Sequence, residues 1–288
     1  MGAPRTAHTG PTLTPRSPTF PRRPVHVLVD WDETVTARDT LEVLADAAYG
    51  AHARAGRAVE PWKHFVDTYL ADYSTKAASL PPRKTAEDEA EFAVAMRPVE
   101  DASVARVSAG GVFAGLTPVD LDSAAAAVDA LVRPGWWEFY ADVQTKASVA
   151  ICSVNWCASV IRRVLASRGS SEIAANDFEL DADGTTTGTI TGTMRASPDK
   201  VAVVDRARED SRVVYIGDSG TDLGALLTAD TGIIFDSGKG FPARVRALGI
   251  AVEPIEAYRA HAVSRGRTVF VAPSWAAITD ARVVDMEQ

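Results

Sequence analysis

The sequence is poor in three features, and each shortage excludes a class of protein. Its 288 residues include only two cysteines, Cys152 and Cys157, too few for a disulfide framework or a thiolate zinc site, and we expect both to be buried and inert. No apolar run approaches the roughly 18 residues of a membrane span. The 30 basic residues are outnumbered by 38 acidic ones, so the positive field of nucleic-acid-binding proteins is missing. We therefore expect a soluble, cytoplasmic, globular enzyme or binding protein with no nucleic-acid or membrane partner.

Proline, and arginine without any acidic residue to balance it, are features of the start of the chain. Residues 1–24 hold four arginines, six prolines and no acid, which leaves a net charge of −12 on the rest. Such a stretch buries too little apolar surface to offset the entropy of ordering, so we predict a disordered tail. A transit peptide and an N-myristoylation signal at residues 1–6 are the alternatives, but dense proline and the short match favour the tail.

Apolar patterning divides the remaining chain into two parts. Residues 37–135 show helical spacing, broken by Pro and Gly pairs, with no clear strand. From residue 136 onward, β-branched runs alternate with helices of about 8–12 residues, as in right-handed βαβ units. We predict an α/β fold: a doubly wound, Rossmann-like parallel sheet formed by residues 25–36 and 136–288, with a helical insert at 37–135 after the first strand.

Individual elements follow from the same patterns. The expected strands lie at 25–29, 148–152, 212–216, 232–235 and 268–271, and a β-hairpin spans 178–191. The expected helices lie at 40–48, 62–73, 86–96, 121–132, 158–167, 199–208 and 222–227.

Small, polar and acidic residues follow the predicted strands. Ligands of doubly wound sheets bind at the carboxyl ends of the strands, so these residues are expected to meet at one edge. Taken alone, each segment is an ordinary turn or helix cap, but their joint occurrence in this order is not expected by chance. The segments are Asp30-Trp31-Asp32-Glu33-Thr34, Ser153-Val154-Asn155, Ser197-Pro198-Asp199-Lys200 and Gly217-Asp218-Ser219-Gly220-Thr221-Asp222.

The residue types in these segments fit phosphoryl transfer to water. Four carboxylates at one edge raise each other's pKa unless a cation neutralises them, and all-oxygen ligands select a hard ion such as Mg²⁺. A carboxylate beside Mg²⁺ and a lysine can attack phosphorus, and a second one can act as general acid and base. The candidate Mg²⁺ ligands are Asp30, Asp32, Asp218 and Asp222, and the candidate phosphate-binding residues are Ser153, Lys200, Thr34 and Asn155.

From about residue 25 to 240, these segments resemble the four motifs of the haloacid dehalogenase superfamily, and the insert resembles the cap of its phosphoserine-phosphatase-like members. The resemblance implies that Asp30 is the nucleophile and Asp32 the general acid and base, which also lends its carbonyl to Mg²⁺. Ser153 and Lys200 would hold the phosphoryl group. Asp218 would bind Mg²⁺, and Asp222 would bind it directly or through water. The dehalogenases themselves lack the second aspartate of the first motif.

The identity of the substrate is the least determined part. Phosphoserine enzymes of the superfamily carry Glu nine residues after the nucleophile, where this chain has Asp39, which disfavours phosphoserine. The segments 30–40 and 153–157 look similar to the phosphatase portion of thiamin-monophosphate phosphatases, and 32–34 to phosphoethanolamine/phosphocholine phosphatases. Asp39 and His64 are the candidate substrate contacts. Aromatic residues in or next to the insert can stack on a heterocycle or surround a cation, although packing in the core is their commoner role.

The leading hypothesis is a Mg²⁺-dependent phosphatase that hydrolyses a small phosphate ester through an aspartyl-phosphate. Two alternatives stay open: a phosphotransferase or mutase, and a non-catalytic metal-binding regulatory protein of the same fold. The sequence indicates no particular oligomeric state.

Overall fold

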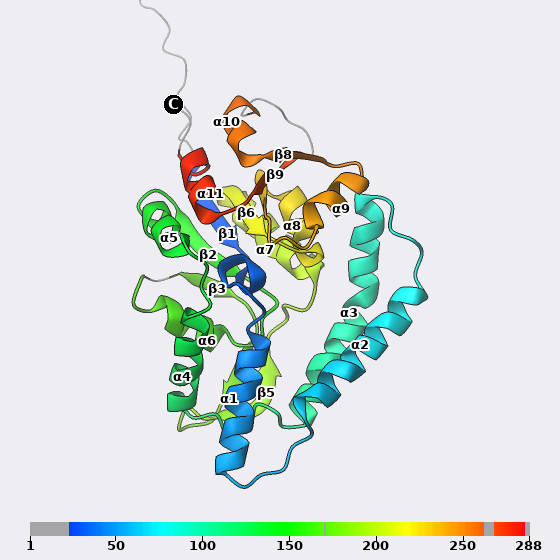
Figure 1. Cartoon of the computed structure of the whole chain (residues 1–288), viewed down its shortest axis with the longest axis vertical. Helices are drawn as coiled ribbons and strands as arrows, with labels where there is room; N and C mark the ends of the chain where they lie inside the picture. The colour runs from blue at the N-terminus through cyan, green and yellow to red at the C-terminus, as the bar shows by residue number, and fades with distance from the viewer. Residues whose placement is uncertain (1–22, 170, 262–267, 286–288) are drawn as a thin grey trace, which may run out of the picture.

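The computed structural model describes residues 23–169, 171–261 and 268–285 (Figure 1). The tail predicted for residues 1–24 therefore lies almost wholly outside the described residues. No helix in the described ranges is long and apolar enough to cross a membrane.

A seven-stranded parallel sheet forms the core, in the order β3-β2-β1-β6-β7-β9-β8. The doubly wound fold predicted from the sequence is confirmed. All five predicted strands are present, with β1 in the middle between β2 and β6. Their bounds are β1 Val25–Val29, β2 Ser148–Cys152, β3 Glu172–Ala174, β6 Arg212–Gly217, β7 Thr231–Phe235, β8 Ala251–Pro254 and β9 Thr268–Ala272.

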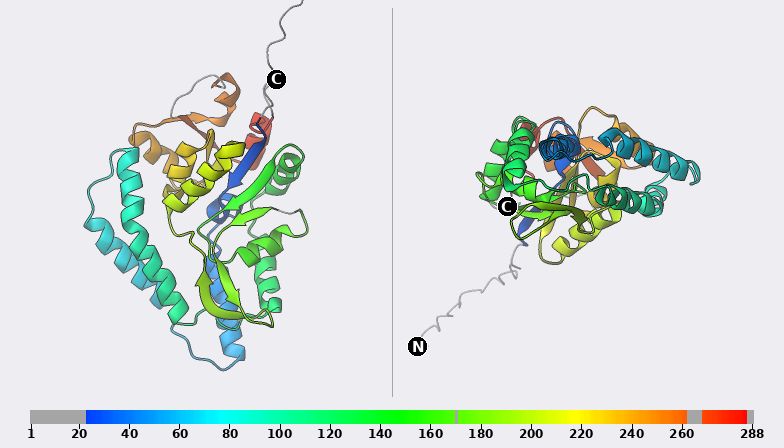
Figure 2. Two further views of the ribbon diagram at one scale, coloured as in Figure 1. Left: turned by 180° about the vertical axis from the view of Figure 1, so that it is seen from behind. Right: turned by 90° about the horizontal axis from the view of Figure 1, so that it is seen from below.

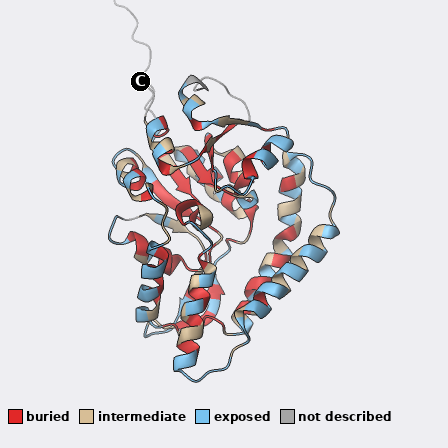
Figure 3. Cartoon of the chain, in the orientation of Figure 1, coloured by how far each residue is buried: buried red, intermediate tan, exposed pale blue. Residues whose placement is uncertain are grey.

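Side chains of the strands point alternately to the two faces of the sheet, and each face packs against a layer of helices. Val27 and Val29 belong to one apolar cluster with α5 (Trp136–Gln144) and α11 (Trp275–Ala281). Leu28, between them, faces the second cluster. This cluster is completed by α7 (Ser197–Asp210), α8 (Leu223–Thr228) and α9 (Phe241–Ala247). The central strands are consequently buried on both sides (Figure 3).

Between β1 and α5 the chain forms four helices: α1 Leu41–Arg54, α2 Trp62–Ala78, α3 Ala86–Ala109 and α4 Pro118–Asp129. The pair α1 and α4 packs together, and α4 also packs on α6 (Ala158–Leu165). The hairpin of β4 (Asp177–Leu180) and β5 (Thr186–Thr191) lies close to α3. Helices α2 and α3 lie side by side along one flank of the molecule (Figures 1 and 2).

The predicted end of the helix at residue 96 is wrong, because α3 continues through Pro98 to Ala109. Proline costs a helix one backbone hydrogen bond, but buried side chains hold this helix on both sides of it, Met96 before and Val104 after. Arg97 donates to Asp199 Oδ1 at 2.8 Å and Oδ2 at 2.9 Å, at the start of α7. Near the start of α3, Glu89 pairs with Arg244 of α9. The insert is thus fixed ionically to the helix that carries Lys200.

Candidate active site

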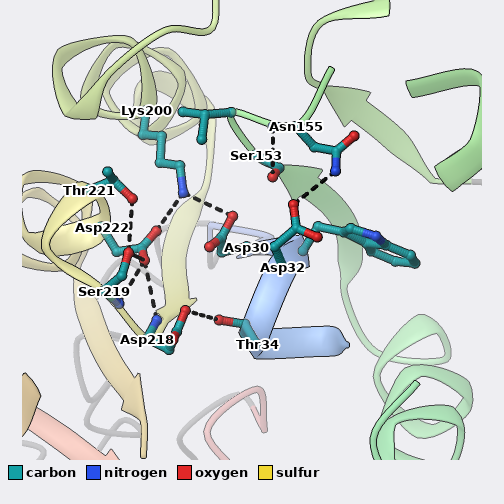
Figure 4. Close-up of polar contacts among 12 residues, drawn as sticks. Asp30, Asp32, Thr34, Ser153, Asn155, Lys200, Asp218, Ser219, Thr221 and Asp222 are labelled. Carbon is teal, nitrogen blue, oxygen red and sulfur yellow. Dashed lines mark hydrogen bonds and ion pairs between the residues drawn. The ribbon is translucent and has the colours of Figure 1, made fainter. Parts of the chain in front are cut away.

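Three core elements converge on Asp30 at the carboxyl edge of the sheet (Figure 4). Asp30 directly follows β1, and its N–H donates to Ile216 O at 2.9 Å, which extends the ladder with β6 by one residue. Asp218 follows β6, the neighbouring strand. Lys200 lies in the first turn of α7, where Pro198 near the helix start has a favourable backbone angle and no N–H to lose.

Lys200 is fully buried between two carboxylates. Its Nζ lies 2.9 Å from Asp30 Oδ1 and 2.7 Å from Asp222 Oδ1. Burial alone would lower the pKa of the amine, but the charges of Asp222 and Asp30 outweigh it, so the pKa of Lys200 is raised. The lysine is therefore a permanent positive charge beside Asp30.

Asp222 organises the loop that carries Asp218. Its Oδ1 accepts from Lys200 and from the Tyr215 hydroxyl at 2.7 Å, and its Oδ2 accepts from Asp218 N at 3.2 Å and from Ser219 N and Oγ at 3.0 and 2.9 Å. Close packing also requires glycine at 217, since a Cβ there would lie 2.4 Å from Asp222 Cγ. Both Asp222 oxygens are occupied, so this carboxylate has the least capacity left for a direct metal bond.

Asp218 by contrast has a free oxygen. Its Oδ1 accepts from the Thr34 hydroxyl at 3.1 Å, whereas its Oδ2 is buried without a hydrogen-bond partner in the described part of the chain. One carboxylate oxygen from each of Asp30, Asp218 and Asp222 lies within 4.8 Å of the other two. An orphaned oxygen in an all-carboxylate cluster fits a hard divalent cation such as Mg²⁺.

The same crowding alters the protonation of the cluster. Burial, reinforced by Asp222, raises the pKa of Asp30 well above its usual range and that of Asp218 to about 6. Without a metal ion, Asp30 and Asp218 therefore keep their protons to higher pH than ordinary aspartates do.

Metal-free protein should accordingly become less stable as the pH rises. Because the pKa of Asp218 is about 6 in the folded state and near 4 in the unfolded chain, the unfolded state deprotonates first. Its stability relative to the folded state then grows with pH, which lowers the free energy of unfolding. In EDTA, the free energy of unfolding of Asp218→Asn should fall between pH 4 and 7.5 by about 2 kcal/mol less than that of the wild type does. Urea unfolding of both proteins at the two pH values measures this, and equal falls would contradict it.

Three hydrogen bonds hold the carboxylate of Asp32, which lies on the side of the site away from Lys200 (Figure 4). Residues Trp31–Val35 form an irregular turn in which Glu33 has a left-handed φ of 62°. Asp32 Oδ1 accepts from Thr40 N at 2.8 Å and Oγ1 at 2.6 Å, and its Oδ2 accepts from Asn155 Nδ2 at 2.8 Å. Burial, followed by the charge of Asp39, raises the pKa of Asp32 to about 6, despite these hydrogen bonds. A carboxyl group with this pKa can exchange protons near neutral pH.

The structure brings most of the predicted site residues together. Asp30, Asp32 and Ser153 line one cavity of about 610 Å³ together with Asp218, and the Lys200 ammonium contacts Asp30. Thr34 and Asn155, predicted to bind phosphate, donate to Asp218 and Asp32, and Asn155 also lines the cavity.

The two candidate substrate contacts are separated by the fold. Asp39 lines the cavity, whereas His64 is exposed on α2, its ring against Phe65, and does not line it. Thr40 and Tyr215, which hold Asp32 and Asp222, were not among the predicted site residues. Tyr215 is a polar residue that follows two valines in a strand, which is a signal in the sequence, whereas Thr40 carries no comparable signal.

The insert supplies the opposite wall of the cavity. Helix α2 contributes Trp62, Phe65 and Tyr69, and α3 contributes Glu100 and Val104. Other aromatic residues of this region, such as Phe113 and Trp136, are fully buried in the core. Both cysteines are also buried, as predicted, and burial raises the pKa of each thiol to about 12, so that little thiolate forms near neutral pH.

A model of the haloacid dehalogenase-like hydrolases matches residues 27–227, and the chain belongs to this family. The resemblance inferred from the four motifs is confirmed.

Particular relatives extend over most of the chain. A CTO1 family protein of Schizosaccharomyces pombe is 27% identical over 282 residues, covering 88% of this chain and 98% of that protein. The mitochondrial bifunctional TH2 protein of Arabidopsis thaliana is 24% identical over 279 residues, covering 85% of this chain and 45% of that protein. Among solved structures, a probable phosphoserine phosphatase from Vibrio cholerae has a TM-score of 0.50 at 16% identity, covering 77% of this chain and 59% of that one, which shows the shared fold.

Proposed function

We propose that the protein is a Mg²⁺-dependent phosphatase that hydrolyses a small phosphorylated metabolite through an aspartyl-phosphate on Asp30. The observation that carries the proposal is the placement of Asp30: it lines a cavity, lies 2.9 Å from a fully buried ammonium, and is close to the Asp218 oxygen that has no hydrogen-bond partner among the described residues. Membership of a hydrolase family supports it.

In the first step, an Asp30 carboxylate oxygen attacks phosphorus as the bond from phosphorus to the leaving oxygen breaks. Asp32 donates its proton to that oxygen, so the product is a neutral alcohol. Lys200 and Ser153 hold the phosphoryl oxygens as charge redistributes over them. Held by Asp30 and Asp218, with the Asp32 carbonyl that the family resemblance adds, Mg²⁺ would supply charge neutralisation for the phosphoryl group.

In the second step, the roles of Asp32 reverse. Now a carboxylate, it takes a proton from water, and the water oxygen attacks phosphorus and releases Asp30 and inorganic phosphate. The pKa of about 6 suits both tasks, because neither the acid nor the base form is scarce near that pH. Thr40 and Asn155 supply three hydrogen bonds that orient the side chain.

Removing the metal tests this proposal. Excess EDTA is expected to lower phosphate release from p-nitrophenyl phosphate by at least about a hundredfold, and added Mg²⁺ to restore it, because the metal offsets charge at the reacting group. Full activity in EDTA would refute the dependence on Mg²⁺.

Labelled water separates hydrolysis from the alternatives. In water enriched in ¹⁸O, one solvent oxygen is expected in each phosphate released. Transfer to another alcohol without solvent label would identify a phosphotransferase, and metal binding without any turnover would identify a regulatory protein.

A further inference from the structure

The turn that carries Asp32 contains a glutamate in a conformation that residues other than glycine rarely adopt. Asp32 has φ −67° and ψ 133°, and Glu33 has φ 62° and ψ −6°. These are the central angles of a type II turn, whose third residue is ordinarily glycine because a Cβ is disfavoured at positive φ. A glutamate keeps this conformation only where the surrounding contacts impose it.

Three contacts from separate parts of the chain hold Glu33. Its N–H donates to Thr36 Oγ1 at 3.3 Å, its carboxylate pairs with Lys239, and its carbonyl accepts from Arg133 Nη2 at 3.0 Å. The first contact is local to the turn. Lys239 is exposed, and an ion pair at an exposed lysine contributes little. The hydrogen bond from Arg133 is therefore the contact best placed to fix the turn from outside.

The guanidinium group of Arg133 is itself well fixed. Its Nε donates to Thr36 O at 3.1 Å, so one planar group spans two carbonyl oxygens. Its Cζ lies 5.0 Å from the centre of the Phe235 ring at the end of β7, which adds a cation–π contact from the core. The side chain is half-buried, and these contacts direct its donors toward the turn.

Arg133 lies where the chain returns from the insert to the core. The outgoing and returning segments run antiparallel, with Ala37 N donating to Leu131 O at 2.8 Å and Arg133 N donating to Val35 O at 2.9 Å. From the returning segment, the Arg133 side chain reaches back to Glu33, 100 residues earlier in the sequence. The turn of Asp32 is thus completed by a residue from the far end of the insert.

We infer that Arg133 is a positioning residue for proton transfer by Asp32: by holding Glu33 at positive φ, it fixes the backbone from which the Asp32 carboxyl group projects. This inference rests on the proposed phosphatase activity, in which Asp32 gives its proton to the leaving oxygen as the bond from phosphorus to that oxygen breaks. Without Arg133, Glu33 is free to relax to negative φ, which rotates the peptide that joins it to Asp32. A displacement of about 1 Å in a catalytic group can cost about a hundredfold in rate.

The acidity of the leaving group tests this role. Phenyl phosphate and p-nitrophenyl phosphate share an aryl ring, but phenol, with a pKa of about 10, needs a proton donor far more than p-nitrophenol, which leaves readily as an anion. At saturating Mg²⁺, Arg133→Met should lower kcat/KM for phenyl phosphate at least about tenfold more than for p-nitrophenyl phosphate. The matched control is Arg168→Met. It removes an exposed arginine whose Cζ lies 4.6 Å from the centre of the Trp137 ring, and it should leave both values unchanged.

Glycine at position 33 should remove the need for Arg133. Because glycine adopts positive φ without a steric cost, adding Glu33→Gly to Arg133→Met should recover most of the selective loss on phenyl phosphate. Arg133→Lys keeps the positive charge but lacks the planar fork that spans two carbonyls, so it should show a selective loss of the same kind. This variant replaces Arg133→Met in the comparison if the methionine variant does not fold.

The outcomes separate this inference from the proposed function. Equal losses on the two esters, or no loss on either, would overturn the role of Arg133 and leave the phosphatase intact. A selective loss that Glu33→Gly does not restore would overturn the action through the turn. If the wild type hydrolyses neither ester with Mg²⁺, the proposed function and this inference are both refuted.

Discussion

Replacing Asp30 with asparagine is expected to lower phosphate release at least about a thousandfold, with the fold retained. The amide has nearly the same shape as the carboxylate but is not a nucleophile, so no phosphoryl-enzyme forms. Burial, together with the charges of Asp222 and Asp218, raises the pKa of Asp30, so the substitution also removes a carboxyl group that is costly to ionise in the folded state. In EDTA, the melting temperature of Asp30→Asn should therefore equal or exceed that of the wild type.

Steady-state kinetics with p-nitrophenyl phosphate and thermal melting in EDTA provide the two readouts. Asp46→Asn, an exposed acid on α1, is the matched control and should leave both unchanged. Turnover close to that of the wild type in Asp30→Asn would place the nucleophile elsewhere.

Replacing Lys200 with methionine is expected to affect both activity and stability. It removes a cation that touches Asp30 and Asp222, all three groups being buried. Loss of one partner from a buried ionic group costs about 3–5 kcal/mol, since the remaining charge is uncompensated. Loss of a cation at the phosphoryl oxygens should reduce kcat by at least about a hundredfold.

The stability loss should depend on pH. Burial raises the pKa of Asp30, and the charge of Lys200 opposes this rise. Without Lys200, the pKa of Asp30 should therefore rise further. A group whose folded pKa exceeds its unfolded value stabilises the folded state at low pH and loses this effect as pH rises. Lys200→Met should consequently be closer to the wild type at pH 5 than at pH 8 in urea unfolding. Lys63→Met, on an exposed lysine of α2, is the control, and a loss in Lys200→Met that does not vary with pH would contradict the argument.

Much of the core was predictable because burial on both faces produces continuous apolar strands that end abruptly at polar residues. Asp30 and Asp218 were placed together by this rule alone. The edge strands β3 and β8 were missed, since they are short and only partly buried and so have no such apolar run. Helix α3 was predicted too short because tertiary contacts offset the cost of Pro98, and a local pattern does not contain those contacts.

The finer contacts of the site depend on side-chain direction, which spacing does not determine. Thr40 reaches Asp32 only because the turn between them includes a residue with positive φ. Thr34 and Asn155 are near the predicted phosphate position, yet their donors point to neighbouring carboxylates. The direction of the His64 side chain was not predictable from the sequence. Helix α2 buries one residue, Phe65, and so has no pronounced apolar face that would show which side of the helix faces the core.

The position of β1 inside the sheet, between β2 and β6, has a consequence for synthesis of the chain. Its neighbours in the sheet come much later, because His26 pairs with Ser148 and Val25 with Arg212. At about 5–20 residues per second, a ribosome needs roughly 10–40 s to reach β6 after β1 has been made. During this interval an apolar strand has no partner and is exposed to aggregation or to chaperones. Asp30 meets Lys200 and Asp218 only at the end of that process, so the appearance of activity should mark completed folding, after the helices of the insert have formed.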